Sequence, residues 1–414
     1  MVSTPGVDDY LESVLRSVPL LPAERVELDA AQGRTLQEPV HAATSLPAFD
    51  NSAMDGFAVR FADLAVASRS GIPSLRVVAD LPAGTDEDPT LPSRTAARIM
   101  TGAPIPTDAD TVIPFEDTAD GLTDSLTTTS ITRLPPASGA HVRRLGDDAQ
   151  RGDEIVTAGT VLGSLQIAAI AAVGVDSVLV TRALRVAVIS TGSELVEPGV
   201  PLRRGQIPES NSRMLAALAV EAGCTVVRRA SIPDEPARLI ELLAEVTAPS
   251  SSQCADVVLF SGGVSAGACE VVKLALAAEM TFTHVAMRPG RPQGFGVSRV
   301  GTVMFGLPGN PVSAAVSFEA FVRPALMQMQ GRLDVHRPSL LLPAASGWRS
   351  PAGRRHYVPV SIDRSDPAGW VAVPVGPGGS HRASTLGRSD GYAVIPEDAH
   401  EVRPGDRVRV MLTS

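Results

Sequence analysis

Three apolar segments in the middle of the chain each lead directly into a glycine-containing turn. They are Val186–Glu194, Val257–Ser265 and Val303–Pro311. A helical pattern follows each turn, and this strand–turn–helix order is typical of a parallel sheet with helical crossovers. In such a sheet the turns gather at the carboxyl ends of the strands, where ligands bind. The pattern therefore predicts a doubly wound α/β domain whose ligand-binding edge carries these turns.

The residue types in the three turns favour an anionic ligand. Glycine lets the backbone approach a ligand closely, and free amides at a helix N-terminus attract negative charge. Asn310, before Pro311, is also a good N-cap, and capping is compatible with anion binding. We therefore expect the turns to contribute these ligand-binding residues: Ser190, Thr191, Gly192, Ser261, Gly262, Gly263, Ser265, Pro308, Gly309, Asn310 and Ser313.

The chain contains a single lysine, Lys273, which follows the second turn. All the other residues among its 36 basic ones are arginine. A lone exception near a ligand-binding edge suggests a position where a compact ammonium fits and a guanidinium fork does not. The alternative is a residue without a special role on a solvated helix face.

Three acidic residues follow neighbouring strand ends and could meet in one cleft: Glu194, Asp234 and Glu270. Carboxylates beside phosphate-binding amides are a common way to hold Mg²⁺, which also takes oxygens from the substrate. Alternatively, acids at helix starts complement the helix dipole, and for Asp234 taken alone this interpretation is favoured. The pattern predicts a magnesium site chiefly for Glu194 and Glu270.

Two arginines flank a turn stiffened by prolines, just after a predicted strand at 282–287. They are Arg288 and Arg291. Guanidinium groups on a rigid loop can bind a phosphate or another oxyanion through paired hydrogen bonds. We prefer this oxyanion clamp to an ordinary surface turn because the loop follows a strand end on the same edge.

The 414 residues are long enough for about three domains. We expect an α/β multidomain protein with a central doubly wound α/β domain whose sheet is mostly parallel. An N-terminal mixed or β region would occupy 1–180 and include an inserted β domain at about 60–145. The α/β domain would span 181–331 and a small C-terminal β-barrel-like domain 338–414. The strongest expected elements are helices at 7–21, 162–173, 212–222, 235–244, 270–278 and 311–330, and strands at 177–180, 185–190, 225–230, 256–260 and 302–306.

Composition excludes several classes of protein. The net charge of −9 gives no basic footprint for nucleic acid. Three cysteines without Cys-x-x-Cys spacing form neither a disulfide framework nor a zinc knuckle. The N-terminus lacks the pattern of a signal peptide, and no stretch is apolar enough to span a bilayer, so we expect a soluble cytoplasmic protein. The NAD fingerprint and the Walker A pattern are both absent from the sequence.

Six short motifs occur in order along nearly the whole chain. They are Asp50–Phe57, Ile99–Pro104, Ser190–Leu195, Ser261–Ser265, Leu307–Ser313 and Gly379–His381. Together they resemble the molybdopterin molybdenumtransferase (molybdenum insertase) family, which includes the C-terminal domain of gephyrin. Each motif alone is weak, but six in register are a specific signal.

The resemblance implies an elongated homodimer with a site between the α/β domain of one subunit and the N-terminal region of the other. The implied substrates are adenylylated molybdopterin and molybdate, with Mg²⁺ as cofactor and AMP as a product. The enzyme that supplies the adenylylated substrate is a further expected partner. By motif position, the resemblance assigns Asp55, Thr101, Asp148, Glu194 and Glu270 to the catalytic and metal-binding neighbourhood. It assigns Lys273, Arg288, Arg291 and the turns at Gly262, Gly263, Pro308 and Gly309 to the pterin phosphate and nucleotide pocket, and Ser380 to the vicinity of molybdate.

This sequence departs from the family pattern at several positions. Ser193 and Glu270 stand where the family usually has aspartate, and the longer Glu270 could shift the metal. Arg288 and Arg291 replace lysines, which is unsurprising in a chain almost without lysine. Lys273 matches a lysine of the family.

Two alternative functions remain open at the level of sequence. The related molybdopterin adenylyltransferases share the α/β domain, but they typically have Gly-Gly-Thr-Gly at Gly262–Ser265 and lack the flanking β regions. A scaffold or ligand-binding paralogue without catalysis would be expected to have lost Asp55 or Glu194, and both are present.

Overall fold

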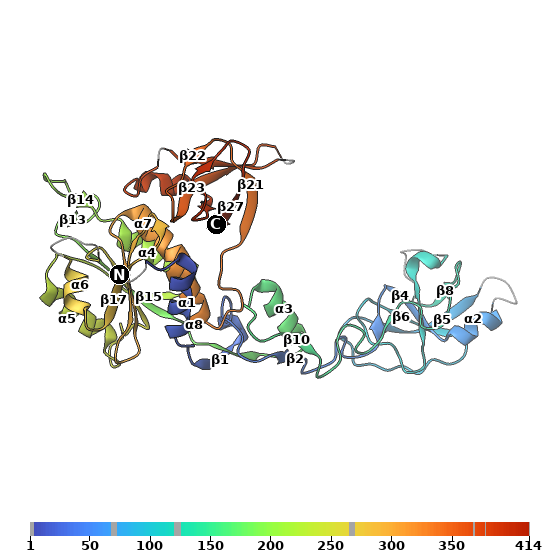
Figure 1. The fold of residues 1–414 in the computed structure, drawn as a ribbon. Helices are drawn as coiled ribbons and strands as arrows, with labels where there is room; N and C mark the ends of the chain where they lie inside the picture. Colours follow the sequence, from blue (N-terminus) through green and yellow to red (C-terminus); the bar gives the residue numbers. More distant parts are fainter. Residues whose placement is uncertain are drawn as a thin grey trace.

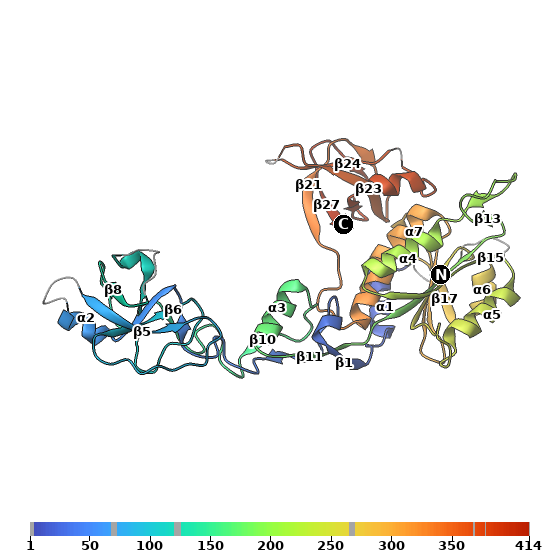
Figure 2. The same cartoon turned by 180° about the vertical axis from the view of Figure 1, so that it is seen from behind.

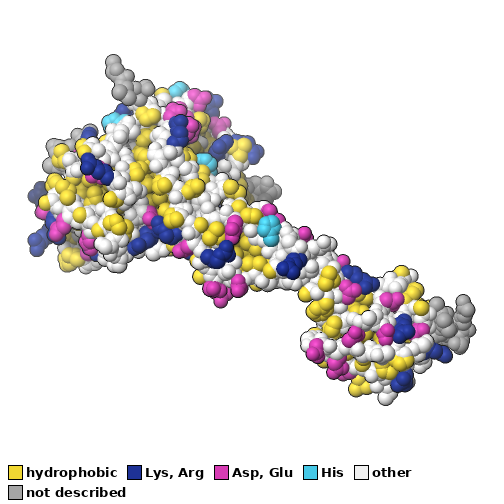
Figure 3. Space-filling view, turned by 90° about the horizontal axis from the view of Figure 1, so that it is seen from below, with side chains coloured by type: hydrophobic (Ala, Val, Ile, Leu, Met, Phe, Trp, Pro, Cys, Tyr) yellow, Lys and Arg dark blue, Asp and Glu magenta, His cyan; other side chains and the backbone are white. Residues whose placement is uncertain are grey.

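The computed structural model describes residues 4–67, 73–119, 126–264, 270–366, 369–376 and 378–413. The molecule is elongated: a compact body holds the α/β domain and the C-terminal β domain, and an arm leads from it to a distal β domain (Figures 1 and 2). A view from below shows acidic and basic side chains spread over the body, the arm and the distal domain (Figure 3). None of the described helices has the length and apolar character needed to cross a membrane.

The α/β domain is built on a six-stranded sheet in the order β15-β12-β16-β20-β19-β17. The four strands β15, β12, β16 and β20 are parallel, as the sequence predicts, whereas β19 runs antiparallel to both of its neighbours, β20 and β17. β19 is a strand that the sequence analysis does not identify. The bounds are β12 Arg185–Thr191, β15 Thr225–Ile232, β16 Val257–Ser261, β17 Met280–His284, β19 Pro292–Val297 and β20 Val303–Leu307.

The single strand expected at 282–287 is wrong in its extent. β17 ends at His284, and β18 (Met287–Arg288) pairs instead with β23 of the C-terminal domain. The backbone amide of Val285 donates to the carbonyl of Arg291, next to the last pair of β17 and β19, so the loop that contains β18 begins after this point. Proline at position 289 has no amide to continue a ladder. The predicted edge loop therefore connects two domains.

Helices cover both faces of the central sheet (Figure 1). Along β12, Val186 and Val188 join one buried cluster, and Ala187 and Ile189 join the other. Because both faces are covered, the strand is apolar throughout. The predicted helix 311–330 is present but contains a π-helical turn at Phe318–Val322. One face carries α1 (Val7–Ser17), α4 (Asn211–Glu221), α7 (Pro311–Ser317) and α8 (Arg323–Met329), and the other carries α5 (Pro236–Thr247) and α6 (Val271–Leu276).

The arm and the distal domain are formed by the N-terminal region. In the arm, β1 (Ala23–Glu27) pairs with β11 (Ser177–Thr181), β2 (Val40–His41) pairs with β10 (Glu154–Val156), and α3 spans Ser164–Ala172. The distal domain has a five-stranded sheet in the order β7-β4-β6-β5-β8. Its elements are β3 (Asn51–Ser52), β4 (Gly56–Val59), α2 (Phe61–Ala67), β5 (Ser74–Leu81), β6 (Thr95–Ile99), β7 (Thr111–Pro114), β8 (Thr128–Ser130) and β9 (Val142–Arg143).

The C-terminal domain is barrel-like, as expected. Its sheet runs β18-β23-β25-β27-β21, and β24 pairs with β23 on the same side as β18 but farther along the strand. A bridge between Ala344 and Ala372 brings the end of β21 to β24 and closes the ring. The bounds are β21 Ser339–Pro343, β22 Trp348–Arg349, β23 Arg355–Asp363, β24 Val371–Pro374, β25 Gly391–Ile395, β26 Glu401–Val402 and β27 Arg407–Leu412.

Candidate functional site

A pocket of about 730 Å³ lies at the carboxyl ends of β12, β16 and β20. The parallel register places Ser190 beside Ser261 and Ser261 beside Leu307, so the three turns begin at one level. We call this cavity the acidic pocket, because four carboxylates and no arginine or lysine occur among the described residues that line it. The predicted residues that line it are Ser190, Thr191, Gly192, Glu194, Asp234, Ser261, Gly262, Gly263, Glu270, Gly309 and Asn310. Ser265 lies outside the described residues.

The second turn is held so tightly against the first strand that it requires glycine. Gly262 has a φ of +90°, and a Cβ atom there would lie 2.5 Å from the carbonyl oxygen of Thr191. The Gly262 amide donates to the carbonyl of Leu307 at 3.1 Å, which ties this turn to the end of β20. Glycine thus allows the close backbone approach that forms the floor of the pocket.

The three predicted metal-binding carboxylates line the acidic pocket, but they do not form a preassembled cluster. No group of three or more His, Cys, Asp or Glu side chains among the described residues is placed to hold a metal ion. The backbone amide of Ser193 donates to Asp234 at 3.1 Å, and the amide of Asp234 donates to the Ser193 hydroxyl at 3.2 Å. Mg²⁺ usually takes one or two protein carboxylates and fills its other positions with water and phosphate oxygens. The donor set therefore fits a magnesium ion whose coordination is completed by a phosphate-bearing substrate.

Two residues of the acidic pocket were missed by the sequence analysis. Glu209 is 1% exposed and accepts hydrogen bonds from the Ser190 hydroxyl and from the amide and hydroxyl of Ser212. Asn211 donates from its side-chain amide to the Ser261 hydroxyl at 2.8 Å and to the Gly309 carbonyl at 2.6 Å. For this part of the chain the sequence predicted only a helix at 212–222, whereas α4 begins at Asn211. Their burial against the strand ends depends on the tertiary fold.

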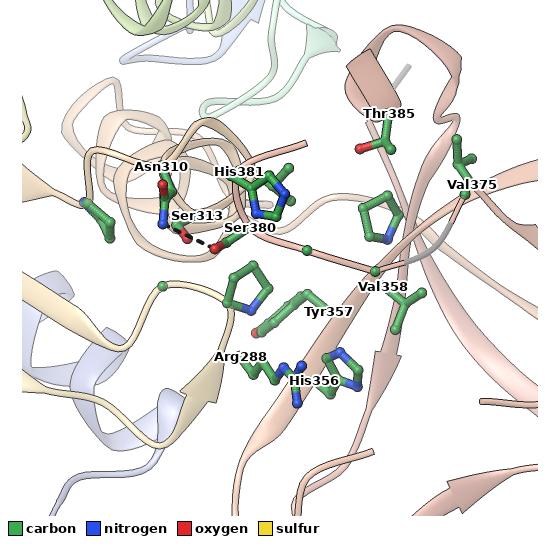
Figure 4. Close-up of a pocket in the computed structure, with 18 of the residues that line it drawn as sticks. Arg288, Asn310, Ser313, His356, Tyr357, Val358, Val375, Ser380, His381 and Thr385 are labelled. Atoms are coloured by element: carbon green, nitrogen blue, oxygen red, sulfur yellow. Dashed lines mark hydrogen bonds between the residues drawn. The ribbon is translucent and has the colours of Figure 1, made fainter. Parts of the chain in front are cut away.

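A second pocket of about 630 Å³ lies between the α/β domain and the C-terminal domain (Figure 4). We call it the basic pocket, because its lining includes Arg288 and Arg349 and, among the described residues, no acid. The predicted residues Pro308, Ser313 and Ser380 also line it. The two pockets adjoin, since Gly309, Asn310 and His381 line both.

The expected capping role of the Asn310 side chain is wrong. Asn310 occupies the N-cap position of α7 but makes no side-chain capping bond. Its side-chain amide instead donates to the Ser380 hydroxyl at 3.1 Å (Figure 4). The backbone amide of Val312 donates to the Ser380 carbonyl at 3.1 Å. A segment of the C-terminal domain therefore satisfies the helix end, and one of the amides expected to meet an anion is already used.

Known protein families and relatives match this chain over most of its length. Family models match residues 6–174 (MoeA N-terminal region, domain I and II), 187–328 (probable molybdopterin binding domain) and 342–413 (MoeA C-terminal region, domain IV). Molybdopterin molybdenumtransferase 2 of Mycobacterium tuberculosis is 43% identical over 394 residues, which are 93% of this chain and 94% of the relative. The chain belongs to the molybdopterin molybdenumtransferase family. It is thus an enzyme of molybdenum cofactor biosynthesis.

Other members of the molybdopterin molybdenumtransferase family are similar to this chain over nearly its whole length. The molybdopterin molybdenumtransferase of Haemophilus influenzae is 32% identical over 409 residues, 98% of this chain and 97% of the relative. A crystal structure of a molybdopterin biosynthesis MoeA protein from Pyrococcus horikosii has a TM-score of 0.81 and 30% identity, with 100% of both chains covered. The resemblance drawn from the six motifs is confirmed.

Three residues that the family motifs assign to catalysis lie far from both pockets within this chain. Asp55 and Thr101 belong to the distal domain, where Asp55 lies between β3 and β4 and Thr101 follows β6, and this domain is at the opposite end of the molecule from the α/β domain (Figures 1 and 2). Asp148 lies between β9 of the distal domain and β10 of the arm. The Thr101 amide and hydroxyl donate to Asp55 at 2.7 and 2.8 Å. These hydrogen bonds, the backbone one foremost, lower the pKa of Asp55, which keeps it ionised. Their catalytic roles stay predictions.

Two predicted cationic residues do not line either pocket. Arg291 lies on the loop between β18 and β19. Of the two arginines of the predicted oxyanion clamp, only Arg288 lines the basic pocket. Lys273 is exposed on α6, although its backbone amide donates to the carbonyl of Gly263 at 3.1 Å. The lysine therefore lies next to the second turn, and its role as a ligand-binding residue stays a prediction.

We expect His356 in the basic pocket to remain neutral at mildly acidic pH. Burial, and then the charge of Arg288, lower the pKa of His356 from its usual 6.5 to about 4. Between these values the unfolded chain binds a proton that the folded chain does not, so His356 disfavours folding as the pH falls from 6.5 towards 4. An NMR titration, with the His356→Gln variant to assign the resonance, should show a midpoint near pH 4. A midpoint near 6.5 would mean that this imidazole is solvated.

Proposed function

We propose that this enzyme inserts molybdate into adenylylated molybdopterin in a Mg²⁺-dependent reaction that cleaves the phosphoanhydride bond and releases AMP. The observation that carries the proposal is the pair of adjoining pockets of opposite character. Phosphate held with Mg²⁺ calls for carboxylates and backbone amides, whereas a free oxyanion such as molybdate calls for donors without carboxylates. The acidic pocket suits the first ligand and the basic pocket the second.

Individual residues take the following parts in this proposal. Ser190 to Gly192, Ser261 to Gly263 and the Pro308–Gly309 turn bind the pterin phosphate and the nucleotide. Arg288 and Ser380 bind molybdate, because a guanidinium group and a hydroxyl both donate hydrogen bonds to oxyanions. Mg²⁺ would be held by Glu194, Glu270 and Asp234. When bound, this ion would neutralise negative charge on the phosphates.

A homodimer would bring the distal residues to the site. The helix α3 supports this, because it has the sequence SLQIAAIAA and only Ile170 in it is buried. A helix that is apolar all round is normally covered. Leu165 on this helix is 79% exposed, and Leu333, which lies against Gly159 just before it, is 81% exposed. A second copy over this surface could supply Asp55, Thr101 and Asp148 to the acidic pocket.

The direct test is an assay of AMP release from adenylylated molybdopterin. We expect the purified protein to release AMP when molybdate and Mg²⁺ are present, and chelation of the metal with EDTA should slow the release by more than about ten-fold. Nucleotide turnover only with ATP and unmodified molybdopterin would assign the chain to the adenylyltransferase reaction instead. Binding of these ligands without any turnover would indicate a scaffold or binding role.

A further inference from the structure

The wall between the two pockets is held by a chain of hydrogen bonds that crosses from one domain to the other. Gly309 and Asn310 form this wall, and His381 of the C-terminal domain completes it. A ligand in either pocket therefore lies against the same short turn. A shift of this turn would change the lining of both pockets.

On the side of the acidic pocket, the turn is fixed by Asn211. This side chain is buried, with 9% exposed, and both protons of its amide are used in bonds to the Ser261 hydroxyl and the Gly309 carbonyl. It thus joins the second turn to the third. A ligand that packs on the Ser261–Gly263 turn also favours the position in which Asn211 holds the carbonyl of Gly309.

On the side of the basic pocket, the turn is fixed by Ser380. The Asn310 side chain donates to the Ser380 hydroxyl, and the next backbone amide along the chain, that of Val312, donates to the Ser380 carbonyl (Figure 4). Asn310 makes this interdomain bond in place of the capping bond that its position favours. The position of Ser380, and with it one wall of the basic pocket, therefore depends on the conformation of the Gly309–Asn310 turn.

We propose that Asn211 and Asn310 are positioning residues that couple the two pockets, so that a nucleotide in the acidic pocket raises the affinity of the basic pocket for molybdate. This rests on the proposed function, in which both ligands bind at once. The coupling favours the complex that holds both substrates. Repulsion between the bound nucleotide and molybdate lowers the affinity for molybdate. This repulsion is the same in the wild type and in any variant that binds both ligands in the same positions. The contribution of the hydrogen bonds is therefore the difference between the wild type and such a variant.

The test is a calorimetric titration of the full chain with molybdate, with and without saturating AMP and Mg²⁺. The coupling factor is the molybdate Kd without AMP divided by the Kd with AMP. Asn211→Ala should lower this factor by about three- to ten-fold, the size expected for loss of one or two hydrogen bonds. Ser210→Ala is the matched control, because Ser210 lines the same pocket and is exposed. It should retain the wild-type factor.

The outcomes separate this inference from the proposed function. Equal coupling factors in the wild type and Asn211→Ala, with both ligands bound, would overturn the coupling and leave the proposed function standing. Failure of the wild type to bind AMP or molybdate would overturn both. If Asn211→Ala does not fold, Asn310→Ser provides the same comparison, since serine is a good N-cap but is too short to reach Ser380. A reduced factor in Asn310→Ser supports the coupling, and an unchanged one contradicts it.

Discussion

Two inactive variants should restore activity when they are combined in one dimer. We expect Asp55→Asn and Glu194→Gln each to slow AMP release by at least about 100-fold, because Glu194 is proposed to hold the Mg²⁺ that neutralises the phosphates and Asp55 is assigned to the catalytic neighbourhood. If each site combines the distal domain of one subunit with the α/β domain of the other, a mixed dimer has one doubly altered site and one intact site. Co-expression with two different tags and purification through both should give about half of the wild-type rate.

The control for this complementation uses two variants on the same side of the proposed site. Asp55→Asn combined with Asp148→Asn should stay inactive, since both carboxylates are assigned to catalysis and both come from the N-terminal region on the same side of the proposed site. Every site of that mixed dimer then carries one alteration. A mixed Asp55→Asn and Glu194→Gln dimer as inactive as its parents would contradict a site shared between subunits.

A charge on the exposed face of α3 should separate the subunits and abolish activity. Leu165→Glu places a carboxylate where the leucine is 79% exposed in the single chain and, in the proposed dimer, covered. Burial of an unpaired charge costs several kcal/mol, which is enough to dissociate a moderately stable dimer. Light scattering should give the single-chain mass of 43.0 kDa in place of twice that value. AMP release should fall to the level of Asp55→Asn.

The matched control changes an equally apolar residue on another helix. Ile240 is 53% exposed and belongs to α5, a helix on the side of the α/β domain away from α3 (Figure 1). Ile240→Glu should keep the dimer mass and the activity. If Leu165→Glu is also dimeric and active, the α3 surface is not the contact that completes the site.

Most of the α/β domain could be predicted because its signals are local. Apolar runs buried on both faces, followed by glycine turns, identify β12, β16 and β20 and place their ends at one edge. The same reasoning brought Glu194, Asp234 and Glu270 to one pocket. In each case the direction of a parallel strand and the position of the next helix are enough to locate the residue.

Errors occurred where a residue bonds to a distant part of the chain. Asn310 has the sequence of a capping residue, yet its amide bonds to Ser380, which is 70 positions away. The expected strand at 282–287 divides because Arg288 pairs with His356 of the C-terminal domain. Glu209 and Asn211 carry no motif that marks them in the sequence, and only the fold makes them buried residues of the acidic pocket.

The amino-acid sequence by itself determined the family, the strand–turn–helix core and the chemical types of the groups at its edge. These follow from local periodicity, from glycine in turns and from motifs that occur in order along the chain. Only the tertiary structure decided that the basic pocket lies between the α/β domain and the C-terminal domain, and that Asp55, between β3 and β4, belongs to a domain at the far end of an arm. Local sequence sets strands and turns, but the distance between two domains depends on packing and on hydrogen bonds between residues far apart in the chain.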